Sequence, residues 1–246
     1  MSIQGFEEWL ATPQGQYVLD WELGRHDLLV ADIFGFNAVQ IGLPQHDFLR
    51  ANRMPLRLRC DDRQRETVVV GLHSDLHQLP FATTSVDLVV LPHLLEFDEN
   101  PHQILREVER ILVPEGHVIV TGFNPYSLWG ARRKLTRRKA APPWRGNYIS
   151  VPRLKDWFAL LGFETKGGVF GCYAPAVTQE KWLRRLHFLE SAGDRWWPFA
   201  GAAYILQAVK RVSGMRLITP VWRDRRARAE ALAPVTQRLD TQKDSQ

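Results

Sequence analysis

The chain has 246 residues, of which 45% are hydrophobic, so it can bury a substantial core in one large domain or two small ones. No apolar run approaches the roughly 20 residues of a membrane span, and the first residues lack the basic and apolar regions of a secretory leader. We therefore expect a soluble, cytoplasmic protein. Cys60 and Cys172 stand far apart without metal-ligand spacing, which predicts two buried thiols and no metal site.

The net charge of +5 is unevenly distributed along the chain. Residues 116–155 contain nine Lys or Arg and no Asp or Glu, so the remaining residues sum to −4. Such a patch can attract nucleic acid, an anionic membrane surface or an acidic substrate, and it can equally be a solvated surface.

The first third of the chain alternates between helical and strand-like patterns. Apolar residues recur at helical spacing over 6–36, and Gly35 suits a helix end. The segments that follow are predicted as a strand at 38–41, one or two helical turns at 45–53, a strand at 56–60 and a strand at 68–70.

The remaining two thirds continue the alternation. Val86–Leu91 is the continuous apolar run of a strand that is covered on both faces, and Asn100-Pro101 opens a helix with apolar residues on one face. Further predictions are a strand at 118–121, a basic loop at 131–147, a helix at 154–161, a β-like stretch at 163–173, a helical insertion at 179–191 and a last strand at 202–209.

The repeated order of strand and helix predicts an α/β protein with a Rossmann-like, doubly wound, mostly parallel sheet and helices on both faces. We divide the chain into a helical extension at 1–36, a domain at 37–211 and a basic, flexible tail at 212–246. Ligands of such sheets bind beyond the carboxyl ends of the strands, so the turns there are the places to search for a site.

Residues 74–125 carry five motifs in a fixed order. They are Ser74-Asp75, Leu79-Pro80-Phe81, Val86-Asp87-Leu88-Val89, His93-Leu94-Leu95-Glu96 and Arg110-Ile111-Leu112-Val113-Pro114-Glu115-Gly116. This series closely resembles the type 11 subgroup of class I methyltransferases, which depend on S-adenosylmethionine. The resemblance implies a seven-stranded sheet with an antiparallel last strand, and S-adenosylmethionine as cofactor.

The resemblance also implies roles for individual residues. Asp75 would accept a hydrogen bond from the adenine amino group, as an acceptor-only carboxylate can, and the backbone amide of Leu76 would meet the adenine ring. Asp61, 19 residues beyond Gly42, would bind the ribose hydroxyls, although the adjacent Asp62 is an alternative. Glu96 is expected to serve the fold.

The first glycine loop departs from the family pattern Asp-x-Gly-x-Gly-x-Gly. Its equivalent begins at Gln40 and retains one glycine, Gly42, while Pro44 replaces the second and removes an amide donor. Gln40 replaces an acid but can still hydrogen-bond the methionine part of the cofactor. An alternative alignment would start the loop at Asp32 and use Gly35.

His93 follows the fourth strand, where the methyl acceptor would lie. It is a candidate general base, with a loop-ordering hydrogen bond as the alternative role. Asn124 is a candidate for the acceptor side of the cleft. We therefore predict a methyltransferase of unidentified acceptor. The alternative is a non-catalytic protein that binds nucleic acid or an anionic membrane through Arg132–Lys139.

Overall fold

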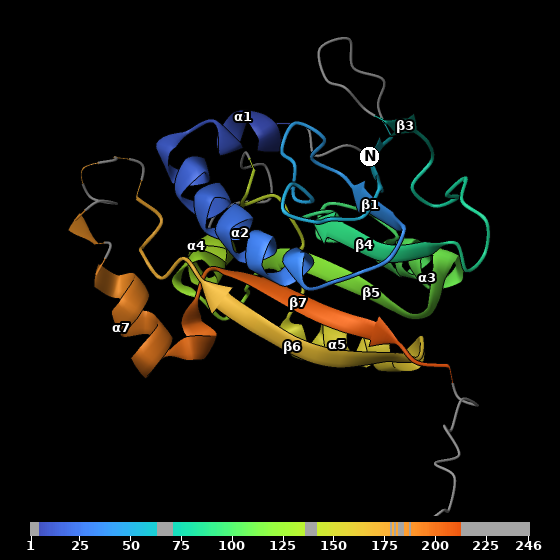
Figure 1. Cartoon of the computed structure of the whole chain (residues 1–246). Helices are drawn as coiled ribbons and strands as arrows, with labels where there is room; N and C mark the ends of the chain where they lie inside the picture. The colour runs from blue at the N-terminus through green and yellow to red at the C-terminus, as the bar shows by residue number, and fades with distance from the viewer. Residues whose placement is uncertain are drawn as a thin grey trace, which may run out of the picture. The chain divides into compact units, whose positions relative to one another are not determined.

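Seven strands form one sheet in the order β3-β2-β1-β4-β5-β7-β6 (Figure 1). The computed structural model describes residues 5–62, 71–135, 142–177, 179, 181, 185–186 and 188–212. The strands are β1 (Asn37–Ile41), β2 (Leu56–Asp61), β3 (Leu72–His73), β4 (Val86–Pro92), β5 (Leu112–Phe123), β6 (Phe163–Gly171) and β7 (Ala203–Lys210). The helices are α1 (Phe6–Leu10), α2 (Pro13–Ala31), α3 (Pro101–Ile111), α4 (Leu128–Leu135), α5 (Val151–Leu160), α7 (Phe188–Trp196) and the 3₁₀ helix η1 (Pro198–Ala200).

The strand pairing confirms the predicted sheet. Strands β1 to β5 pair in parallel, whereas β7 pairs antiparallel with both β5 and β6. The carboxyl ends of β1, β2 and β3 meet at one edge, because Ile41 pairs with Cys60 and Asp61 pairs with His73. That edge is where ligands of such sheets bind.

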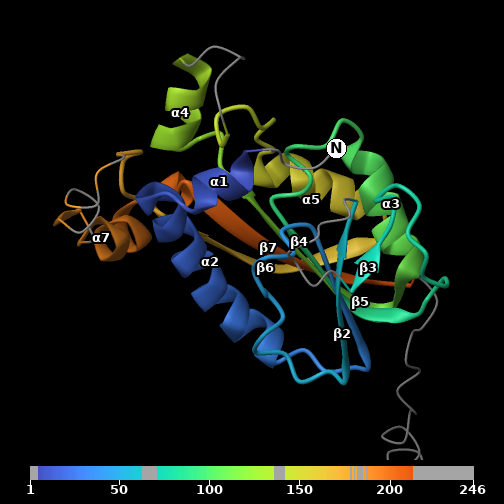
Figure 2. The same ribbon diagram turned by 90° about the horizontal axis from the view of Figure 1, so that it is seen from above.

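Helices cover the two faces of the sheet, with α2 on one face and α3 and α5 on the other (Figure 2). Helix α3 buries Ile104, Leu105, Val108 and Ile111, which recur at helical spacing. Helix α2 buries Val18 and Val30 but also the polar Glu22 and His26. Those two buried polar side chains require partners on the sheet.

Two helices begin at the residue types that favour helix starts. The Thr12 hydroxyl accepts a hydrogen bond from the amide of Gly15 at 3.2 Å, and Pro13 opens α2. Ser150 likewise accepts from the amide of Arg153 at 3.4 Å at the start of α5. These caps fix the helices that enclose the sheet.

Several elements differ from the sequence predictions. Residues 45–53 form turns instead of a helix, and α4 occupies the first five residues of the predicted loop at 131–147. The predicted strand at 68–70 lies outside the described residues, as do 213–246 of the predicted tail. The insertion predicted at 179–191 is only partly described, and α7 begins at Phe188.

Within the described part of the chain, none of the helices combines the length and apolar character that a membrane span requires.

Candidate functional site

Gly42 directly follows β1 and begins the loop that the sequence predicts as the counterpart of a glycine-rich turn. Its φ of +92° lies in the left-handed region that favours glycine, and its amide donates to the carbonyl of Cys60 at 2.9 Å. A side chain there would meet Leu94 Cδ1 at 3.6 Å, so this loop contacts the turn after β4. Gly35 instead precedes β1, at the opposite end of the strand.

Gln40 is fully buried and binds the loop that follows it. Its Nε2 atom donates to the carbonyl oxygens of Gly42 and Leu43, both at 3.1 Å, and of His46 at 2.8 Å. Its Oε1 atom accepts from the amide of Phe48 at 2.9 Å. Both polar atoms of the side-chain amide are thus used by hydrogen bonds within the loop.

This geometry gives a physical reason for the departure from the family pattern. A carboxylate is acceptor-only and cannot donate to the three carbonyl oxygens around Gln40 Nε2. The amide of Gln40 both donates to those carbonyls and accepts from the Phe48 amide. Gln40 therefore has a structural function that the acid of the family pattern could not perform.

Asp61 is the last residue of β2, and its side chain is buried. Its Oδ1 atom accepts from the amide of Asp62 at 3.0 Å, and its carbonyl accepts from the amide of Ser74 at 3.1 Å. Asp62 is half-buried and follows the strand. By register, Asp61 lies between Gly42 on one side and the residues after β3 on the other.

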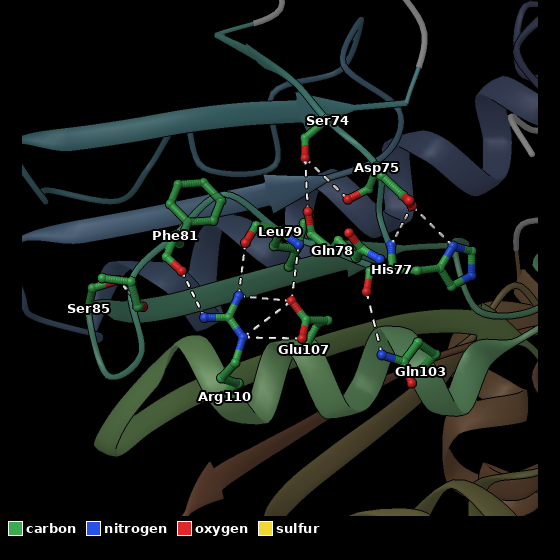
Figure 3. Close-up of polar contacts among 11 residues, drawn as sticks. Ser74, Asp75, His77, Gln78, Leu79, Phe81, Ser85, Gln103, Glu107 and Arg110 are labelled. Atoms are coloured by element: carbon green, nitrogen blue, oxygen red, sulfur yellow. Dashed lines mark hydrogen bonds and ion pairs between the residues drawn. The ribbon is translucent and has the colours of Figure 1, made fainter.

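Asp75 is exposed in the loop after β3 (Figure 3). Its Oδ1 atom accepts from the amide of His77 at 2.8 Å, and this hydrogen bond lowers the pKa of the carboxyl group. The Nε2 atom of His77 contacts Oδ1 of the buried Asp98 at 3.0 Å. Burial opposes the charge on His77, but the two carboxylates outweigh it and raise its pKa.

The side chain of Leu76 is buried in the core on the α3 face. This buried side chain anchors the loop that carries the exposed Asp75.

Arg110 of α3 holds the Leu79-Pro80-Phe81 motif in place. Its guanidinium donates to the carbonyl oxygens of Leu79 and Phe81, both at 2.8 Å, and to Glu107 Oε2 at 2.8 Å (Figure 3). Glu107 in turn accepts from the Leu79 amide at 3.0 Å. The motif that begins at Arg110 therefore binds the motif Leu79-Pro80-Phe81, and this contact holds the loop after Asp75 in place.

His93 is fully buried between two carboxylates. Its Nδ1 atom lies 2.5 Å from Glu96 Oε1, and its Nε2 atom lies 2.6 Å from Oε1 of Glu22 on α2. Burial alone would lower the pKa of His93, but the two carboxylates outweigh it and raise it to about 10. Both ring nitrogens therefore donate, which favours the ordering role over the predicted base.

Aromatic side chains from α1 and the end of β5 cover His93. The Phe6 and Phe123 rings lie 5.0 and 4.5 Å from the imidazole, centre to centre. Trp9, Trp129 and Tyr148 pack next to Phe123. Aromatic side chains from α1, α4 and the loop before α5 thus pack around His93 at the ends of β4 and β5.

Asn124 ties the end of β5 to the segment before β7. Its Nδ2 atom donates to the carbonyl oxygens of Phe199 at 2.8 Å and Gly201 at 3.0 Å. Its Oδ1 atom accepts from the amide of Tyr126 at 3.0 Å. The side chain is buried in these contacts, which do not favour the predicted role toward an acceptor.

Comparison with known proteins gives a consistent result. Residues 52–120 match a family described as a methyltransferase domain. The protein YafS of Escherichia coli K12 is 37% identical over 95 residues, or 39% of this chain and 40% of that one. Demethylmenaquinone methyltransferase of Chlamydia pneumoniae is 30% identical over 83 residues, which cover 32% and 35% of the two chains. The matches therefore span less than half of these curated relatives.

A crystal structure from Thermotoga maritima shares the fold over most of both chains. It is a methyltransferase dependent on S-adenosylmethionine, described as a possible histamine N-methyltransferase. Its TM-score is 0.59 at 16% identity, and the superposition covers 85% of this chain and 96% of that one. The chain has the class I methyltransferase fold. Its Gly42, Asp61 and Asp75 follow β1, end β2 and follow β3, in the order of the family pattern.

Sequence reasoning missed Glu22, His77 and Asp98. Glu22 stands on α2, far from the motifs, and the sequence signal was an acid on the apolar face of a helix. His77 and Asp98 lie within or beside the motif region, but nothing in their spacing predicted that they would meet.

Proposed function

We propose that the protein is a methyltransferase that uses S-adenosylmethionine and acts on an acceptor still to be identified. The observation that carries the proposal is the meeting of Gly42, Asp61 and Asp75 at one edge of a sheet with methyltransferase topology. The match of residues 52–120 to a methyltransferase domain supports it independently.

The residues at this edge fit the adenosine part of the cofactor. Asp61 would hold the ribose hydroxyls and Asp75 the adenine amino group, because carboxylates accept hydrogen bonds from both. Position 40 has no acid that could bind the methionine part of the cofactor, and the amide of Gln40 is already bound within its own loop. That part would therefore rest on backbone groups around Gly42.

When bound, the cofactor supplies an electrophilic methyl group on a sulfonium. Transfer by in-line displacement needs alignment of the acceptor with that group, and a base only if the acceptor must lose a proton. His93 does not accept a proton while both of its nitrogens donate to carboxylates. We infer that the chain contributes alignment and that His93 orders the turn after β4.

Isothermal titration of the full chain with S-adenosylmethionine and S-adenosylhomocysteine tests the proposal. We expect binding of both, weakened in Asp61→Asn more than in Asp62→Asn, because Asp61 is the more buried acid at the strand end. If neither compound produced a heat of binding at millimolar concentration, the proposed cofactor would be refuted. Equal effects of the two substitutions would refute the ribose assignment alone.

A further inference from the structure

Exposed apolar side chains gather at one end of the molecule. Among the described residues, thirteen large hydrophobic side chains are exposed, and seven of them belong to the segments 126–135 and 188–199. Those seven are Tyr126, Leu128, Leu135, Phe188, Trp196, Trp197 and Phe199. Both views place α4 and α7 at the same end, beyond the carboxyl end of β5 (Figures 1 and 2). We call this surface the aromatic end.

Helix α4 turns an apolar stripe toward solvent. Leu128, Ala131 and Leu135 are exposed and stand three and seven residues apart, which places them on one face of a helix. The helix is held in this orientation by the buried Trp129, whose Nε1 atom donates to the carbonyl of Ala174 at 2.9 Å. An apolar stripe in this position is unfavourable in water alone.

The second part of the aromatic end follows α7. Trp196, Trp197 and Phe199 are 70, 65 and 75% exposed. This segment is held at the end of β5, four residues before α4 begins, because Asn124 donates to the Phe199 carbonyl at 2.8 Å. The acid Glu190 of α7 is turned inward, since it accepts from the amides of Cys172 and Tyr173.

Most of the charges in these two segments are positive, although α7 also contains Asp194 beside Arg195. Arg132 and Lys134 of α4 and Arg195 of α7 are exposed, and residues 116–155 contain no acid. The sequence continues after α4 with Arg137, Arg138 and Lys139. Basic residues beside exposed tryptophan and leucine match the composition of helices that lie in the interface of an anionic bilayer.

We propose that the aromatic end binds the surface of an anionic membrane. Tryptophan rings rest at the headgroup level, the leucines of α4 enter the acyl boundary, and the Lys and Arg side chains meet lipid phosphates. Nucleic acid fits this surface less well. Single strands stack on aromatic faces, but nothing in them contacts an outward stripe of aliphatic side chains such as Leu128 and Leu135.

Co-sedimentation of the full chain with lipid vesicles tests the proposal. The vesicles contain phosphatidylcholine alone, or phosphatidylcholine with about one third phosphatidylglycerol. We expect binding only to the anionic vesicles and a loss of binding as salt rises. The combined variant Trp196→Ser, Trp197→Ser and Phe199→Ser should bind at least about tenfold more weakly, because it lacks the interfacial side chains.

The matched control is Phe34→Ser with Phe36→Ser. These side chains are 75 and 74% exposed but precede β1, at the opposite end of the sheet, so this variant should bind as the wild type does. A second variant, Leu128→Ser with Leu135→Ser, tests the α4 stripe on its own, and circular dichroism confirms the fold of each variant.

Three outcomes would overturn the proposal. The first is that the wild type does not bind anionic vesicles. The second is that the control variant Phe34→Ser with Phe36→Ser loses as much vesicle binding as the variant at Trp196, Trp197 and Phe199. The third is that both aromatic-end variants bind the vesicles as tightly as the wild type does. Tight binding of single-stranded nucleic acid that is lost with Arg132→Ser and Lys134→Ser, without vesicle binding, would assign the surface to nucleic acid instead.

Discussion

Glu22 and His93 are 71 residues apart in sequence, yet the Glu22 Oε1 atom lies 2.6 Å from His93 Nε2 with both side chains fully buried. The contact joins α2 to the turn after β4. Because a buried charge without its partner is costly, removing one member should destabilise the fold strongly.

Glu22→Gln should therefore lower the free energy of unfolding by about 3–5 kcal/mol. Urea denaturation followed by circular dichroism measures the change. Asp20→Asn on the same helix is the control, because Asp20 is exposed and its loss should cost within about 0.5 kcal/mol. Similar values for the two variants would show that the contact contributes little.

The same network predicts how stability depends on pH. The pKa of His93 is raised from 6.5 to about 10 in the folded chain, so the folded state holds a proton that the unfolded chain releases above pH 6.5. Its contribution is fully present below pH 6.5 and is lost as pH rises toward 10. Between pH 7 and 9, wild-type stability should fall more steeply than that of His93→Asn, by up to about 1.4 kcal/mol per pH unit. Parallel slopes in urea titrations would contradict this assignment.

Placing an acid at position 40, as the expected motif has it, should destabilise the protein. In Gln40→Glu, three loop carbonyls lose their donor and face a buried carboxylate, so we expect a loss of about 1–3 kcal/mol and no gain in cofactor affinity. The exposed Gln78→Glu is the control for an added charge. Thermal unfolding and calorimetric titration measure the two effects, and tighter cofactor binding by Gln40→Glu would disprove the structural role.

Asp75→Ala should weaken S-adenosylhomocysteine binding by about 1–3 kcal/mol through the loss of a charged acceptor. Its side chain is exposed, so the melting temperature should hardly change. Asp32→Ala provides the control, because Asp32 is also exposed but lies at the end of α2, before β1. An unchanged dissociation constant for Asp75→Ala would remove Asp75 from the site.

Arg110→Ala should cost about 1–3 kcal/mol in stability, because two loop carbonyls and Glu107 lose their donor. Arg106→Ala on the same helix is exposed and should change stability within about 0.5 kcal/mol. If Arg110→Ala abolished cofactor binding without loss of stability, the motif would act on the ligand and not on the loop.

The sequence predicted the fold well because its signals are local. The continuous apolar run at Val86–Leu91 and the apolar face of α3 each indicate in the sequence which residues are buried in the structure. The acids at the strand ends were likewise placed by their distance from strands and by the family pattern. The antiparallel arrangement of the last strand came only from the resemblance, since no local pattern fixes strand direction.

The roles of Gln40, His93 and Asn124 could not be predicted in the same way. Each is decided by partners that only folding supplies: loop carbonyls for Gln40, a carboxylate from α2 for His93, and the carbonyls of Phe199 and Gly201 for Asn124. Residue type and spacing indicate that such a side chain is polar and near the site. They do not show which groups in the folded chain its hydrogen bonds reach.

The contact of Glu22 with His93 also bears on where the domain can be divided. A boundary at residue 37, as the sequence suggested, would separate His93 after β4 from its partner Glu22 on α2. It would also separate Thr121 of β5 from its partner His26. A fragment that starts there would keep every described strand, but it would leave an ionised histidine beside a single buried acid and one face of the sheet without α1 and α2. We therefore expect residues 5–36 and the sheet to fold as one unit, and a fragment that begins at residue 37 to be strongly destabilised relative to the whole chain.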